Sequence, residues 1–265
     1  MPRAIWSGTV SFGLVNVPVK LSTAVSKKDV RFHMLHAADG SRIEQRRVCS
    51  LEGTEVAYDD LVRGYEWAPG EHVVVTPQEL EALDPEATRT IDILDFVNEA
   101  DIDPVYFQHP YYLTPDGRAA EKAYALLRSA MARTRKVAIA RFVMRTKEYL
   151  AAVRAVGPAL LLSTMLFHDE VLPVATVEDA LPPADVDGTD REVEMAERLI
   201  ESLSTDWEPE RYHDRYRERV LELIEAKAAG QEIVAAPAAP QPAAVVDLVA
   251  ALEASLEEAA KRESA

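Results

Sequence analysis

The chain has 265 residues, of which 48% are hydrophobic and 28% charged, and its net charge is −16. This length and composition fit a globular protein with a well-buried core, and the single cysteine, Cys49, excludes an internal disulfide and favours a reducing cytoplasm. The N-terminal residues lack the apolar core of a signal peptide, and no stretch approaches the roughly 18 apolar residues of a membrane span.

The first 50 residues alternate apolar and polar side chains with the period of two that is typical of β-strands. The alternation is clearest at 10–14 and 15–21. Gly8 and Gly13 suggest a bulge or a tight bend between paired strands. Further short strands are expected at 30–34 and 43–48.

Residues 58–100 predict a mixture of short helices and strands. The helices are expected at 58–65 and 76–83, and the strands at 72–75 and 90–97.

A longer helix is predicted at 118–132, where apolar residues recur at i, i+3, i+4 and i+7. Three strands follow it, at 136–147, 149–156 and 160–167. Such consecutive strands form an antiparallel meander that closes a sheet or a barrel.

The C-terminal part is predicted to be helical. An amphipathic helix is expected at 189–203, with Thr189 as its N-cap, and a second helix at 209–229. Residues 231–244 read as a Pro/Ala linker that does not fold.

Residues 245–265 predict a short amphipathic helix. Leu248, Leu252 and Leu256 lie on one stripe at helical spacing. A helix of this length has too few contacts to be stable alone in water, so we expect it to dock a partner through this stripe. The alternative is a loosely packed, frayed tail.

Charge is strongly segregated along the chain. Residues 118–154 carry a net charge of +8, whereas 51–117 and 155–265 carry −14 and −15. This pattern indicates a polyanion-binding surface on an otherwise acidic body. The alternative is an internal network in which these cations pair with the acids of 51–117.

The strand expected at 136–147 has two unlike faces. One face is apolar, whereas the other carries Arg141, Arg145 and Lys147. Because a strand residue advances about 3.3 Å, Arg145 and Lys147 would lie roughly 7 Å apart. Arginine binds phosphate oxygens through paired hydrogen bonds, so we expect a rigid cationic track for a duplex backbone that does not read bases. The candidate DNA-binding residues are Lys20, Arg31, Arg46, Arg47, Arg133, Arg135, Lys136, Arg141, Arg145 and Lys147.

Motifs for catalysis are absent from the sequence. It contains no nucleophile elbow, no phosphate-binding loop and no zinc-protease motif, and its histidines are scattered. We therefore expect no catalytic residue, no metal and no cofactor.

Several sequence blocks stand in order across residues 3–230. They include RAIWSGTVSFGLVNVPVKL, DFVNEADIDPVYFQHPYYLTPD, KVAIARFVMRTKEYLAAVRA and DWEPERYHDRY. Together they resemble bacterial Ku, the DNA end-binding family of nonhomologous end joining. Ordered matches over most of a chain are far more specific than any single short motif.

The resemblance implies a mixed α and β fold, with an antiparallel β-barrel core, flanking helices and a C-terminal helical region. It assigns the barrel and a helical dimer arm to residues 1–230. It further implies a homodimeric ring that threads onto the ends of double-stranded DNA, without catalysis, in the cytoplasm near the nucleoid. The implied partner is the multifunctional ATP-dependent DNA ligase D.

One position departs from the family. Where many members have Cys-x-x-Cys, this chain has one thiol, Cys49, followed by Glu52 three residues later. A single thiol is a poor zinc site, so we expect no metal there and a small buried side chain at Cys49.

The residues alone leave three functional hypotheses open. They are a duplex-binding scaffold, a non-catalytic RNA-binding barrel, and an acidic adaptor whose basic strand is ion-paired internally. Competition between duplex DNA and structured RNA separates the first two. The dependence of binding on salt separates the third.

Overall fold

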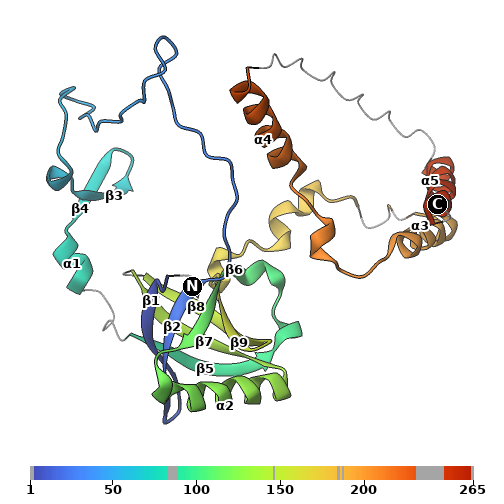
Figure 1. Ribbon diagram of the computed structural model, residues 1–265, viewed down its shortest axis with the longest axis horizontal. Helices are drawn as coiled ribbons and strands as arrows, with labels where there is room; N and C mark the ends of the chain where they lie inside the picture. Colours follow the sequence, from blue (N-terminus) through green and yellow to red (C-terminus); the bar gives the residue numbers. More distant parts are fainter. Residues whose placement is uncertain are drawn as a thin grey trace. The chain divides into compact units, whose positions relative to one another are not determined.

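The computed structural model describes residues 3–82, 89–145, 147–183, 186, 188–230 and 248–263. The chain forms two compact units. The first runs to Pro173 and holds the barrel, and the second starts at Val174, holds the C-terminal helices, and also includes Asp29–Phe32 (Figure 1). Among the described helices, none has the length and hydropathy needed to span a bilayer.

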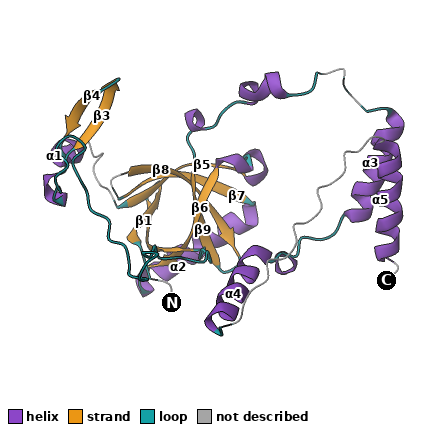
Figure 2. Cartoon of the chain, turned by 90° about the horizontal axis from the view of Figure 1, so that it is seen from above, coloured by secondary structure: helices purple, strands orange, loops and turns teal. Residues whose placement is uncertain are grey.

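The first unit is built on a closed barrel with the strand order β1-β2-β6-β9-β8-β7-β5, seen as a ring in Figure 2. The strands are β1 (Trp6–Phe12), β2 (Val15–Thr23), β5 (Thr90–Asn98), β6 (Phe107–Pro115), β7 (Lys136–Met144), β8 (Lys147–Val156) and β9 (Ala159–Met165).

One pair in the barrel is parallel. Neighbouring strands run antiparallel all the way round except β1 and β5, which pair in parallel over Thr9–Ser11 and Thr90–Asp92. An odd number of strands cannot alternate direction around a closed ring, so the barrel needs one such seam. The predicted barrel is therefore confirmed, with this addition.

Alternate residues of each strand fill the interior of the barrel. On β2 these are Val17, Val19 and Leu21, all fully buried. On β7, Ala138 and Phe142 belong to the same core, as expected from the alternation. The apolar face predicted for this strand is confirmed.

Helix α2 (Arg118–Thr134) covers one end of the barrel and packs chiefly against β8, β2, β6 and β7. Its buried face carries Tyr124, Leu127 and Met131. The Tyr124 hydroxyl donates to the Leu113 carbonyl at 2.7 Å and accepts from the Leu160 N–H at 2.8 Å. One phenol therefore ties the helix to β6 and β9.

The second unit contains α3 (Asp190–Leu203), α4 (Arg215–Ala228) and α5 (Leu248–Glu263). Thr189 caps α3 in a capping box with Glu192, as predicted. The second helix begins later than expected, because Asp214 accepts from the Arg217 N–H at 2.9 Å and so caps α4 there.

Helix α5 packs against α3, and Arg191 lies 3.5 Å from Glu253 across this contact. Leu252 and Leu256 are half-buried. At least part of the predicted docking stripe is therefore used inside the unit. The predicted linker, 231–244, lies outside the described residues.

The segment between β2 and β5 differs most from expectation. The strands expected at 30–34 and 43–48 do not form; only single bridges join Leu35 to Arg42 and Val48 to Glu55. The helix expected at 58–65 is also wrong, because only one 3₁₀ turn forms there, at Tyr58–Asp60. The elements here are η1 (Tyr58–Asp60), the hairpin of β3 (Arg63–Ala68) and β4 (Glu71–Val75), and α1 (Pro77–Ala82).

Five short 3₁₀ turns complete the described secondary structure. They are η2 (Glu99–Asp101), η3 (Pro104–Tyr106), η4 (His168–Glu170), η5 (Val174–Ala180) and η6 (Pro209–Arg211).

Trp6 stabilises the C-terminal end of β7. Its indole N–H donates to the Val143 carbonyl at 3.0 Å, and its ring meets Phe142 edge-on with centroids 5.9 Å apart. The ring lies so close over Gly8 that a Cβ there would collide with it and with the Arg89 carbonyl. The glycine is therefore needed for this close approach, and not for the bulge or bend that the sequence suggested, since β1 and β2 pair in regular register at Gly8.

Gly8→Ala should destabilise the protein by about 1–3 kcal/mol, because the added methyl group collides with the Arg89 carbonyl and forces the Trp6 ring away from Val143. Urea unfolding followed by Trp fluorescence measures the loss. Ser7→Ala, on the same strand, is the matched control. Equal stability of Gly8→Ala and the unchanged protein would contradict this role for Gly8.

Tyr124→Phe should cost about 1–3 kcal/mol, since it leaves the Leu113 carbonyl and the Leu160 N–H without the hydroxyl. Burial also raises the pKa of Tyr124. The neutral phenol is thus favoured in the folded state, and its contribution is full below about pH 10 and lost as pH rises through the raised pKa. Unfolding measured from pH 8 upward should show less alkaline loss for Tyr124→Phe; an unchanged profile would contradict this.

Candidate nucleic-acid interface

The basic strand ends in a tight hairpin. Met144 pairs with Lys147, so Arg145 lies in the turn between β7 and β8. The strand predicted at 136–147 is therefore shorter, and Arg145 and Lys147 do not follow one another on one strand face. The reason is the left-handed backbone of Arg145, with φ of 53°, which ends the strand.

The outer face of β7 is divided into two halves. Val137 is 1% exposed and lies in an apolar cluster with Met165, against which Ile102 and Phe107 pack. Cationic side chains begin only at Arg141. The cationic track expected to run on from Arg141 to the corner at Arg135 and Lys136 is therefore interrupted at Val137, because the turns after β5 supply an apolar cover that strand alternation cannot reveal.

The other half, with the hairpin, carries exposed cations. The Arg141 side chain is 55% exposed and lies 3.8 Å from Glu148, a surface pair too weak to sequester it. The Lys147 amine lies 5.4 Å from the centre of the Tyr149 ring, a cation–π contact that holds the amine at the turn.

The charge of Arg145 also affects the pKa of a tyrosine near the hairpin, Tyr111. Burial raises the pKa of Tyr111, as does the neighbouring Tyr149, whereas the Arg145 guanidinium lowers it. The field of this arginine thus reaches across to β6. Arg141, Arg145 and Lys147 are named here the hairpin cations.

Two arginines hold conformations that glycine or asparagine would adopt more easily. Among the described residues, the only non-glycine residues with positive φ are Arg135 and Arg145, each at 53°. A left-handed conformation costs an L-residue roughly 1–2 kcal/mol. Such strain is a reason to look for function at these positions. They bracket β7, and both carry the side chain best suited to phosphate.

A second cationic group lies at the other end of β7, about 26 Å from the hairpin by strand rise. It comprises Arg133 in the last turn of α2, Arg135 at its C-cap, and Lys136, whose amine donates to the Asn98 side chain at 2.7 Å. Arg135 and Lys136 border a pocket of about 410 Å³, which Arg154 also lines, 2.8 Å from Glu99. Arg154 was not among the predicted residues, although it belongs to the positively charged stretch 118–154 and could have been identified from it.

The remaining candidate residues lie apart from β7. Lys20, on β2, pairs with Asp116 at 2.6 Å. Arg46 pairs with Glu55 at 3.0 Å, and Arg47 lies 5.2 Å over the Tyr58 ring, both on the extended segment after β2. Arg31 belongs to the second unit. Of the ten candidate residues, only those on and beside β7 therefore lie together in groups.

Cys49 is not the buried side chain that was expected. It is half-exposed in a turn, where hydrogen bonds from the backbone of Glu52 and Leu51 lower the pKa of its thiol. Among the described residues, no three His, Cys, Asp or Glu side chains gather as metal ligands would.

The barrel and the family comparison agree. The family model described as "Ku70/Ku80 beta-barrel domain" matches residues 11–195, which include all barrel strands except the first residues of β1. The chain belongs to the Ku family.

Curated Ku relatives match nearly the whole chain. The protein named "Non-homologous end joining protein Ku" from Anaeromyxobacter sp. (strain K) is 57% identical, covering 99% of this chain and 88% of its own. The Ku proteins of Heliobacterium modesticaldum and Mycobacterium tuberculosis are 42% and 39% identical, covering 97% and 99% of this chain and 92% and 97% of their own. The resemblance stated from sequence blocks is confirmed.

Arg145→Gly and Arg145→Ala separate side-chain function from backbone strain. Both remove the guanidinium and should weaken duplex binding equally, reducing the slope of log K against log salt by about 1. Glycine relieves the left-handed strain, so Arg145→Gly should be more stable than Arg145→Ala by about 1 kcal/mol. Fluorescence anisotropy and urea unfolding test the two parts.

The same pair of changes at Arg135 is the matched comparison at the other end of β7. Unchanged DNA affinity in all four variants would remove both arginines from the interface.

Proposed function

We propose that the protein binds the ends of double-stranded DNA without reading sequence and acts in nonhomologous end joining. The main support for this proposal is that the chain belongs to the Ku family, whose curated members are named non-homologous end joining proteins. The hairpin cations supply the chemistry, since exposed guanidinium and ammonium groups on a rigid turn bind phosphate oxygens and not base edges.

The rigidity comes from the barrel. The hairpin is held from inside by Phe142 and from β1 by the Trp6 indole. A cation fixed in this way loses little conformational entropy when it meets a phosphate. We infer that the ten candidate residues named from sequence divide into a principal contact at the hairpin cations and secondary contacts elsewhere.

Ends are bound, in this proposal, by a homodimeric ring threaded onto the duplex. The second unit supports it with an α4 helix that leaves Tyr216 79% exposed, and with a Trp207–Tyr212 stack of 4.9 Å whose rings are also exposed. Large exposed aromatic side chains of this kind indicate an interface. A second copy of the chain is the partner we propose for them.

The ring is further proposed to shield ends and to recruit an ATP-dependent ligase, without catalysis and without a cofactor of its own. Leu248, Leu252 and Leu256 are retained as the stripe that docks this ligase, and of these Leu252 and Leu256 are half-buried on α5. The proposed location is cytoplasmic, on the nucleoid.

Binding to linear and covalently closed DNA of identical sequence tests the threading. A ring enters only at an end, so we expect strong preference for the linear form and protection of that form from an exonuclease. Closed DNA should compete poorly. Equal affinity for the two forms would overturn end binding, and preference for structured RNA over both would favour the RNA-binding barrel.

A further inference from the structure

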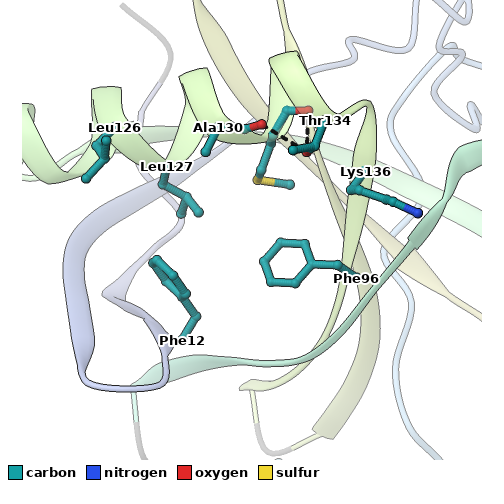
Figure 3. A pocket seen from close by; sticks show the side chains of 8 residues that line it. Phe12, Phe96, Leu126, Leu127, Ala130, Thr134 and Lys136 are labelled. Carbon is teal, nitrogen blue, oxygen red and sulfur yellow. Dashed lines mark hydrogen bonds between the residues drawn. The ribbon is translucent and has the colours of Figure 1, made fainter.

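An apolar groove opens into the barrel beside α2. It has a volume of about 510 Å³ and is lined by Phe12, Phe96, one side of α2 from Leu126 to Thr134, and Lys136 at the start of β7. Figure 3 shows Phe12 and Phe96 directed into the space beneath Leu127. Leu126 is 71% exposed and Phe96 is 44% exposed, so large apolar side chains stand open to water.

The groove exists because β1 ends before it has paired with the full length of β5. Parallel pairing ends at Ser11 with Asp92, and β1 then turns back into β2. Beyond Asp92, β5 continues to Asn98 with β7 on one side only, and no described strand pairs with its other edge. Phe96 pairs with the interior residue Ala138, so its side chain faces the groove side of the sheet.

The polar groups of the groove are few and mostly satisfied. The Thr134 hydroxyl donates to the Ala130 carbonyl at 2.9 Å, and the Lys136 amine is held by Asn98 at the rim. Cations border the groove: Lys122 precedes Leu126 by one helical turn, and Arg133 follows it by two. Asp95 pairs with Ile139 and therefore lies on the outer face of β5, away from the groove.

We propose that this groove binds an extended segment of a partner protein, with large apolar side chains at alternate positions and acidic residues beside them. The free edge of β5 supplies main-chain hydrogen bonds, and Phe12, Phe96 and Leu126 receive the apolar side chains. Lys122, Arg133 and Lys136 select the acidic residues. Six residues of strand span about 20 Å and the groove side of α2 about 12 Å, so a segment of four to six residues fits.

The probe is a library of displayed random nonapeptides, selected against the intact protein. Enriched peptides should alternate large apolar residues and carry Asp or Glu at one end. One synthetic winner, labelled with fluorescein, is then measured by anisotropy. Absence of enrichment, or winners with basic residues, would overturn the proposal.

Leu126→Glu and Phe96→Glu should each weaken the winner at least about tenfold, as expected for central contacts. Ala125→Glu is the matched control on α2, exposed and outside the groove, and should change binding less than about twofold. Equal losses in Leu126→Glu and Ala125→Glu would place the peptide elsewhere. Circular dichroism checks that each variant remains folded.

N-methylation of the winner tests the strand pairing. Methyl groups on alternate amides of one parity should abolish binding, whereas those of the other parity should be tolerated, because only every second N–H of an added strand faces β5. Loss with both parities, or with neither, would contradict strand addition.

Two further outcomes assign the groove to another ligand. If Leu126→Glu abolishes self-association in analytical ultracentrifugation, the groove is an interface between copies. If it abolishes duplex binding, the groove serves DNA. The proposal requires both to be retained, so its failure is distinct from failure of the proposed DNA end binding.

Discussion

The division of β7 between two surfaces is the constraint on which the interface depends. Its inner residues, among them Ala138 and Phe142, are fixed in the barrel core, and this fixes where its outer residues stand. Because side chains alternate along a strand, the position of Arg141 is set by the burial of its neighbours. The cation therefore needs no stabilising partner of its own to be held at the surface.

The same strand shows how a cation-rich segment is restricted to a short region. The turns after β5 cover Val137, so phosphate cannot reach that part of β7. What remains is the hairpin at one end and the Arg135 corner at the other. At both corners an arginine adopts a conformation that glycine adopts more readily. The backbone strain at these two positions is therefore the cost of having a guanidinium group there.

Sequence reasoning was most successful where local periodicity is decisive. It placed the buried face of β7, helix α2 and the Thr189 cap of α3, because burial and capping act within one element. It failed at Arg145, where the turn lacks the Gly or Asn that normally signals positive φ. It also placed strands in the segment before η1, where apolar residues alternate but no neighbouring strand receives their backbone groups. The cover over Val137 comes from residues distant in sequence, which no local pattern reveals.

In the proposed function, fixed cations on a barrel hairpin hold the phosphate backbone and make no contact with the base edges. The most direct test is the salt dependence of binding to several unrelated linear duplexes of equal length, with the unchanged protein and with Arg141, Arg145 and Lys147 all changed to Glu. If about eight phosphates are neutralised, log K should fall against log salt with a slope near −7 for every duplex, and the triple change should remove roughly 3 units of that slope. A slope near zero, or the same slope in the triple variant, would show that these three cations do not hold the phosphate backbone.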